Sequence, residues 1–120
     1  MVNSVVLVGR AGRDAEIRYL EPSGTPKTTF NLAVDRPVKR TEGVDTTDWF
    51  RIELWEKQAQ VAADFVKKGT LVGIQGRLEI QKWKDQNTGQ WREMPVIRAT
   101  NLRLLGKRDD RVAPEGAEAG

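Results

Sequence analysis

Short stretches in which apolar and polar side chains alternate run through most of this chain. Alternation at every second position is the pattern of a strand with one buried face. Residues 46–55 show it most clearly, because Phe50, Ile52 and Leu54 fall on one side and the β-branched and aromatic content also favours a strand. The pattern predicts extended segments at residues 4–9, 16–20, 27–35, 46–55, 70–83 and 91–105.

Residues 56–66 change to a helical period. Their apolar positions form one stripe of Ala59, Ala62, Ala63 and Val66, with Phe65 beside it. We expect Lys67 and Lys68 in the last turn, where they complement the helix dipole, and Gly69 as the C-cap.

The order of these segments predicts a fold class. Residues 16–20 resume the extended pattern of residues 4–9 after a turn, so these two segments count as one strand. The order along the chain is then three strands, one helix and two strands. A single helix between strands 3 and 4 of a five-stranded antiparallel set is the arrangement of the OB-fold barrel, although pattern alone leaves other small barrels open. We therefore expect an all-β OB-fold domain in residues 1–106 and a short, flexible acidic tail in residues 107–120.

Three tryptophans fall on the polar side of this pattern. Trp49 and Trp55 alternate with the core positions of residues 46–55, and Trp83 has the polar parity of residues 70–83. The core side is already filled by Phe50, Ile52, Leu54, Ile74, Leu78 and Ile80. Burial under a loop or at a subunit interface is the alternative for any one tryptophan, but three of them beside basic residues favour a ligand surface.

Indole rings among cations suit single-stranded nucleic acid. Every base can stack on an indole whatever its identity, while Arg or Lys engages the phosphates, and a duplex hides its base faces. The basic residues closest to the tryptophans are Arg51, Arg77, Lys82 and Lys84.

Several of these cations have a plainer interpretation. Lys82 and Lys84 have the core parity, but they precede a hairpin tip predicted at residues 84–90, where that side can leave the barrel. A solvated tip is the alternative for both. Lys57, Lys67 and Lys68 are on the expected helix, where lysines are more often plain surface charge. Trp91 is a candidate cross-strand partner of the strand that bears Trp83.

Composition narrows the function classes. The 120 residues contain no histidine and no cysteine, which removes the commonest general base, the commonest transition-metal ligands and a disulfide framework. We therefore expect a protein that is not an enzyme and uses no cofactor and no metal. An OB-fold nuclease would need clustered carboxylates, and Glu53 and Glu79 are the only acidic residues expected on the tryptophan side.

Charge and hydropathy point to a polyanionic partner. The chain has 20 basic and 17 acidic residues, and residues 109–120 hold four of the acidic and one of the basic ones, which leaves the first 108 residues with a net charge of +6. A basic domain favours polyanions. No run approaches the roughly 18 apolar residues of a membrane span, and residues 1–4 lack the start of a secretory signal, so we expect a cytoplasmic protein and no membrane contact.

Four pieces of the sequence together resemble the bacterial single-stranded DNA-binding protein family. They are residues 9–19, 47–55, 66–69 and 76–83, in the order of the family. The resemblance implies an OB-fold that assembles into a homotetramer, with single-stranded DNA wrapped around it during replication, recombination and repair. It also implies base stacking by Trp49, Trp55 and Trp83, and a DNA path along Arg51, Lys57, Lys68 and Lys82.

Two departures from the family concern its partners. The family often carries a further stacking tryptophan where this chain has Pro37 and Val38. Either one base platform is missing there, or Arg36, Lys39 and Arg40 replace stacking by charge. Family members also commonly end in an acidic, aromatic tip that recruits replication and repair proteins, and residues 116–120 lack it. The alternative is a tailless, primosome-type interaction module whose aromatic surface serves mainly a protein partner.

Overall fold

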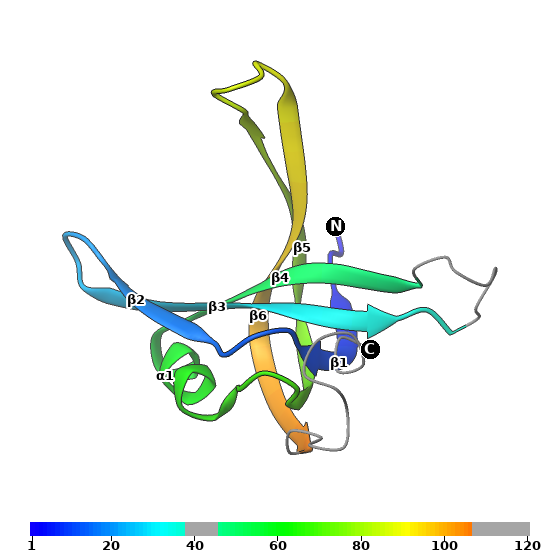
Figure 1. Ribbon diagram of the computed structural model, residues 1–120. Coiled ribbons are helices and arrows are strands. Elements are labelled where there is room, and N and C mark those ends of the chain that lie inside the picture. The colour runs from blue at the N-terminus through cyan, green and yellow to red at the C-terminus, as the bar shows by residue number, and fades with distance from the viewer. Residues whose placement is uncertain (38–45, 107–120) are drawn as a thin grey trace.

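The computed structural model describes residues 1–37 and 46–106. Within these ranges the chain forms six strands and one helix (Figure 1). In chain order they are β1 (Val5–Ala11), β2 (Glu16–Leu20), β3 (Thr25–Asp35), β4 (Thr47–Trp55), α1 (Glu56–Phe65), β5 (Leu71–Lys84) and β6 (Trp91–Gly106).

The strands form a closed ring in the order β1-β5-β6-β4-β3-β2, with β1 also paired to β3. Both β1 and β2 run antiparallel to β3, at Arg10–Ala33 and Glu16–Thr29, so they act as one interrupted strand. Counted in this way, the ring has five strands, with α1 between the third and the fourth. The expected OB-fold is confirmed. One pairing departs from the antiparallel set: β4 and β6 are parallel where residues 51–53 meet residues 96–98.

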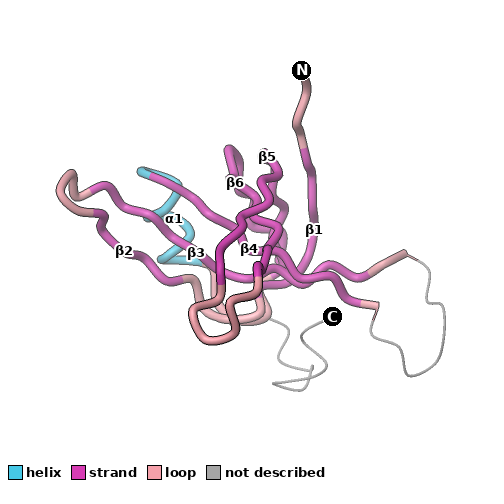
Figure 2. The backbone as a smooth tube through the Cα atoms, turned by 90° about the horizontal axis from the view of Figure 1, so that it is seen from above, coloured by secondary structure: helices cyan, strands magenta, loops and turns pink. Residues whose placement is uncertain are grey.

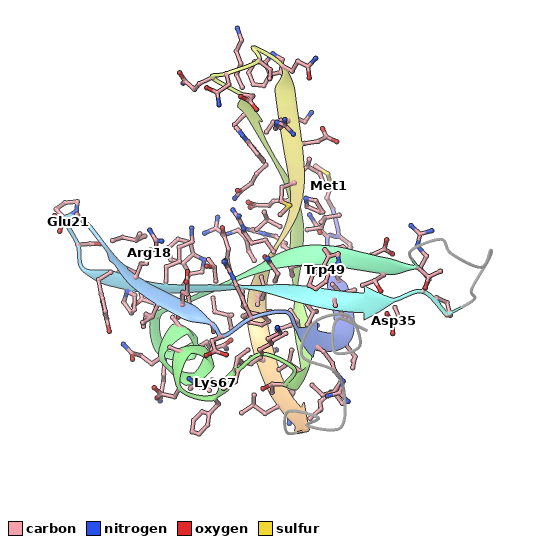
Figure 3. The ribbon with its side chains drawn as sticks, viewed as in Figure 1. Met1, Arg18, Glu21, Asp35, Trp49 and Lys67 are labelled. Atoms are coloured by element: carbon pink, nitrogen blue, oxygen red, sulfur yellow. The ribbon has the colours of Figure 1, made fainter. Side chains whose placement is uncertain are left out.

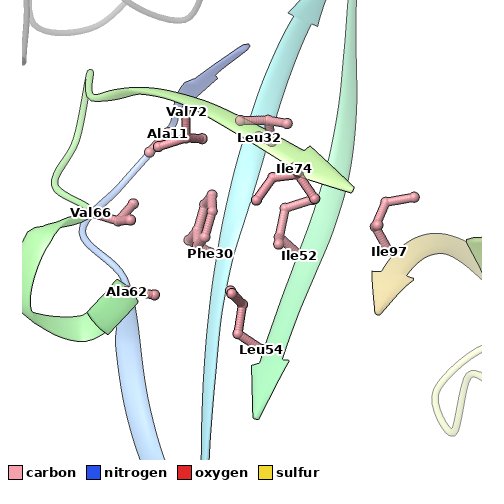
Figure 4. Packing of buried hydrophobic residues seen from close by; sticks show 10 residues of the cluster. All are labelled: Ala11, Phe30, Leu32, Ile52, Leu54, Ala62, Val66, Val72, Ile74 and Ile97. Carbon is pink, nitrogen blue, oxygen red and sulfur yellow. The ribbon is translucent and has the colours of Figure 1, made fainter. Parts of the chain in front are cut away.

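The core forms on the side that the alternation predicts. Ile52 and Leu54 of β4 are fully buried, and so are Phe30 and Leu32 of β3. Figure 4 shows Phe30 in the middle of the cluster. Burial of each of these large side chains contributes about 1.5–3 kcal/mol to folding. The cluster consists of Ala11, Phe30, Leu32, Ile52, Leu54, Ala62, Val66, Val72, Ile74 and Ile97.

Helix α1 covers one end of the barrel with its alanine stripe. Ala59 and Ala62 are fully buried, and the Thr28 hydroxyl donates to the Ala59 carbonyl at 2.6 Å. The helix ends at Phe65, one residue before the predicted end, so Lys67 and Lys68 lie beyond it. Gly69 is not the C-cap, because the Val66 amide makes the closing bond to Ala62. No helix in the described part of the chain is long and apolar enough to cross a membrane.

Strands β5 and β6 continue past the barrel as a two-stranded hairpin (Figures 1 and 2). This extension corrects one predicted core residue. Ile80 has the core parity, but its side chain is 47% exposed because the hairpin has left the barrel at that point. Leu78, two residues earlier, still packs against the core.

Candidate nucleic-acid interface

One outer side of the barrel brings together five of the predicted site residues, namely Trp49, Trp55, Trp83, Arg51 and Arg77. Directly paired residues of neighbouring strands point to the same side of a sheet. The strand register therefore shows which residues share this outer side. Glu53 of β4 lies opposite Arg98 of β6, which in turn lies opposite Arg77 of β5. We call this surface the aromatic face; it consists of Lys27, Trp49, Arg51, Glu53, Trp55, Arg77, Glu79, Trp83, Arg92 and Arg98.

Figure 3 shows how the elements share this side. Trp49 and Arg18 lie on the same side of β2, β3 and β4, while Lys67 lies on the opposite side near α1. The β5–β6 hairpin rises on the side of Trp49. The aromatic face therefore continues from the barrel strands onto the hairpin.

Trp55 is held between two cations from the neighbouring strands. Lys27 of β3 and Arg98 of β6 each lie 5.1 Å from the centre of its ring. Cations at this distance are attracted to the ring face. The indole Nε1 is buried without a hydrogen-bond partner in the described ranges, so the cations and not a hydrogen bond orient the ring.

A carboxylate holds one of these cations in place. The Lys27 ammonium lies 3.3 Å from the carboxylate of Glu53, which is only 4% exposed. Glu53 has the polar parity that the sequence predicts, yet it is buried beneath its neighbours. A buried carboxylate is stable only when it is paired. The Lys27–Glu53 pair is therefore a fixed part of the surface around Trp55.

Trp49 owes its position to a glycine. Its side chain is 40% exposed and lies against Gly12, in the segment between β1 and β2. A Cβ atom at position 12 would lie 2.6 Å from Cζ3 of the indole. The Gly12 amide donates to the Asn31 carbonyl at 2.8 Å, which fixes this segment beside the ring.

Trp83 lies on the hairpin, outside the barrel, and is 47% exposed. Its cross-strand partner is Arg92, whose Nε donates to the Asp85 carboxylate at 2.8 Å. Asp85 also accepts bonds from the Asn87 and Thr88 amides at the tip. These hydrogen bonds lower the pKa of Asp85. The largest effect comes from the Asn87 amide, followed by the Arg92 guanidinium and then the Thr88 amide.

A shallow basic groove lies next to Trp55. Its volume is about 360 Å³, and it runs over β2, β3 and β4. Four cations line it against two carboxylates, so its charge is positive. The lining residues are Arg13, Glu16, Arg18, Leu20, Lys27, Thr29, Arg51 and Glu53.

The connection after β3 begins with an ion pair. Arg36 donates from Nη2 to Asp48 at 3.0 Å, and this bond lowers the pKa of the Asp48 carboxyl. The predicted site residues Lys39 and Arg40 come next along the chain. They lie outside the described residues, as does Val38.

Four predicted cations are not on the aromatic face. Lys84 pairs with Trp91 and Lys82 with Glu93, which places both lysines on the other side of the hairpin from Trp83. Trp91 is 72% exposed there. Lys57 is exposed in the first turn of α1, and Lys68 follows the helix, where its amide bonds to Asp14.

Five cations of the aromatic face and the basic groove were not among the predicted site residues: Arg13, Arg18, Lys27, Arg92 and Arg98. Lys27 does have the polar parity of residues 27–35, which is a usable signal. Its position beside Trp55 depends on the register between β3 and β4. That register could not be read from the chain, because no property of Lys27 alone shows which residue of β4 lies opposite it.

The carboxylates on the aromatic face are paired with cations. Glu79 lies 3.4 Å from Arg77 and 3.6 Å from Arg98, and Glu53 pairs with Lys27. Within residues 1–37 and 46–106, no group of three or more acidic, histidine or cysteine residues is placed to hold a metal ion.

Comparisons with known proteins point in one direction. A family model described as "Single-strand binding protein family" matches residues 2–105. The chain is 50% identical over 109 residues to "Single-stranded DNA-binding protein 1" of Synechocystis, covering 91% of this chain and 88% of that protein. It is 47% identical over 119 residues to the "Single-stranded DNA-binding protein" of Thermosynechococcus vestitus, covering 99% and 94%. A protein of that same name from Streptococcus mutans is 42% identical over 111 residues, covering 92% and 66%.

Proposed function

Because this chain belongs to the single-strand binding protein family, we propose that it binds single-stranded DNA along its aromatic face, without catalysis. The observation that carries the proposal is the row of three outward tryptophans on one continuous side, interleaved with arginines from three strands. The absence of histidine and cysteine from the sequence supports a binding role over a catalytic one.

In this proposal the tryptophans act as base platforms. Trp49 and Trp83 offer open ring surface, whereas Trp55 offers a ring with cations already beside it. Arg51, Arg77 and the cations of the basic groove contact phosphates between the bases. Stacking of this kind tolerates any sequence, so the protein would protect single strands during replication, recombination and repair in the cytoplasm.

A fluorescence titration with oligo-dT tests the proposal. Stacking should quench the tryptophan emission of the protein, and duplex DNA of equal length should bind far more weakly. Replacing Trp49, Trp55 or Trp83 by alanine should each weaken binding by about 1–3 kcal/mol. If the tryptophan emission does not change when oligo-dT is added at low salt, the proposal is ruled out. If the alanine variants change the sedimentation mass but not the affinity, these tryptophans serve a protein contact instead.

We further propose that two or more copies of the chain associate through β1. On one edge β1 pairs with β5, but on the other it meets β3 only at Arg10 and Ala11, so residues 5–9 have a free edge in the described part of the chain. Val6 and Val8 on this strand are 68% and 52% exposed, and with Gly73 and Leu105 they line a groove of about 300 Å³. A free edge bearing apolar side chains is a template for an identical strand, which suits the tetramer expected from the family.

A further inference from the structure

Charged groups of alternating sign cross the aromatic face on either side of Trp55. On one side, Lys27 contacts the ring and pairs with Glu53. On the other, Arg98 contacts the ring and pairs with Glu79, which also pairs with Arg77. Each cation beside the base platform is thus neutralised by a carboxylate of the protein itself.

The second half of this arrangement centres on one oxygen atom. Oε2 of Glu79 lies 3.6 Å from Nη1 of Arg98 and 3.4 Å from Nη2 of Arg77. The two arginines are directly opposite each other on β6 and β5. Like charges in that position repel, and the Glu79 carboxylate between them offsets part of this repulsion.

A glycine fixes this register. At Gly76 the pairing of β5 and β6 shifts, and a Cβ atom there would lie 2.3 Å from the Arg98 carbonyl oxygen. The close approach of the two backbones requires glycine at this position. It sets Arg77 opposite Arg98 immediately after the shift.

Two guanidinium groups around one anionic oxygen form the geometry in which arginine binds phosphate. We propose that Arg77 and Arg98 form a phosphodiester site beside the Trp55 base platform, and that Glu79 occupies this site until DNA phosphate displaces it. The inference rests on the proposed function and adds that a carboxylate of the protein itself competes with DNA phosphate for these arginines. Glu79 makes binding weaker and less dependent on salt than the cations alone would make it.

The two carboxylates beside Trp55 differ in their ability to leave. The Glu53 side chain is only 5% exposed and is paired with Lys27. The Glu79 side chain is 36% exposed, and its partners Arg77 and Arg98 are 57% and 38% exposed. Exposed ion pairs contribute little to stability, so a phosphate can replace the Glu79 carboxylate at small cost.

The test is Glu79→Gln, titrated with oligo-dT at several salt concentrations. The amide keeps the shape of the side chain and removes its charge. We expect affinity about threefold tighter at low salt and a steeper fall of affinity with salt, because two unneutralised arginines then attract counterions and phosphate. The thermal unfolding midpoint should change little.

Glu93→Gln is the matched control. It removes the same charge from the same hairpin, but Glu93 lies opposite Lys82 in the register of β5 and β6, on the side away from the aromatic face. A double-mutant cycle adds a second control: the gain from Glu79→Gln should shrink when Arg98 is already glutamine, and vanish when Arg77 and Arg98 both are.

The outcomes separate the two proposals. One outcome is that the affinity and salt dependence of Glu79→Gln equal those of the unchanged protein or those of Glu93→Gln. Either result overturns the proposal that Glu79 competes with phosphate, and leaves the proposal of single-strand binding intact. A gain of unchanged size in the Arg98→Gln background overturns the two-arginine site. Failure of the unchanged protein to bind oligo-dT overturns the proposed function itself.

Discussion

Among the single residues of the aromatic face, the three tryptophans have different surroundings. Trp55 is flanked by cations, Trp49 rests on the Gly12 backbone, and Trp83 lies on a hairpin outside the barrel. In the proposed mode of binding, a ring with two cations beside it would bring phosphate partners to the base that stacks on it. A ring that rests on glycine offers mainly its open surface. We therefore expect the salt dependence of binding to change most with the surroundings of Trp55.

The glycine beneath Trp49 gives a residue-scale prediction. Gly12→Ala places a methyl group 2.6 Å from the indole and must displace the ring. We expect the oligo-dT affinity to fall by up to the 1–3 kcal/mol attributed to one stacking base, with a shifted tryptophan emission maximum. Because the effect acts through Trp49, Gly12→Ala should add nothing in a Trp49→Ala background. An equal loss in both backgrounds would contradict this account.

Residue-scale features were predictable where they depend on alternation alone. The outward parity of Trp49, Trp55 and Trp83 follows from period two, and so does the burial of Ile52 and Leu54. The cations around Trp55 come from two other strands. No property of Lys27 or Arg98 as single residues distinguishes them from ordinary surface charge, so only the register brings them to the site.

The hairpin between β5 and β6 depends on one aspartate at its tip. Asp85 accepts bonds from two amides and from Arg92, and these bonds require its carboxylate form. A carboxyl whose pKa is lowered on folding stabilises the folded form above its ordinary value, and this stabilisation is lost as the pH falls through the lowered value. The tip should therefore keep its structure at neutral pH and lose it only in acid.

An NMR titration of the Asn87 amide measures this loss. We expect a midpoint below 3.8, the ordinary value for an aspartate. Arg92→Gln should move the midpoint upward towards 3.8, because one of the bonds that lower the pKa of Asp85 is removed. A midpoint at or above 3.8 in the unchanged protein would show that Asp85 does not hold the tip.

The same hairpin shows where element-scale prediction fails. Parity assigned Ile80 to the core, but parity only says on which side of the strand a residue lies. Whether that side faces a core depends on how far the barrel extends, and β5 is longer than the barrel wall. The end of α1 is another case, since the Val66 amide closes the helix before Gly69 is reached.

On the scale of the whole molecule, the free edge of β1 predicts association. Val8→Glu places a charge on the exposed apolar side of this strand and should lower the mass measured by light scattering after gel filtration. Phe65→Glu is the matched control, since Phe65 is 58% exposed on α1, away from β1. The control should keep the mass of the unchanged protein. An unaltered mass for Val8→Glu would place the contact elsewhere.

The ring of strands was predictable as a whole because three kinds of signal agree. Strand alternation, the single helical period and the order of the two together leave few architectures. The parallel pairing of β4 with β6 was not predictable, because these strands are separated by α1 and β5 and no local turn links them. The side of the hairpin on which Lys82 and Lys84 lie, by contrast, already follows from their parity, which is opposite to that of Trp83.

That parallel pairing also orders events during folding. It joins only residues 51–53 to residues 96–98, and the chain between them must first form α1, β5 and part of β6. Bringing together such distant segments costs loop entropy that local hairpins avoid, so we expect closure to be a late step. Arg51 and Glu53 meet β6 only through this contact, and Arg98 reaches Trp55 across it. The aromatic face is thus completed only when the barrel closes. A ligand that binds this face would therefore stabilise the closed barrel.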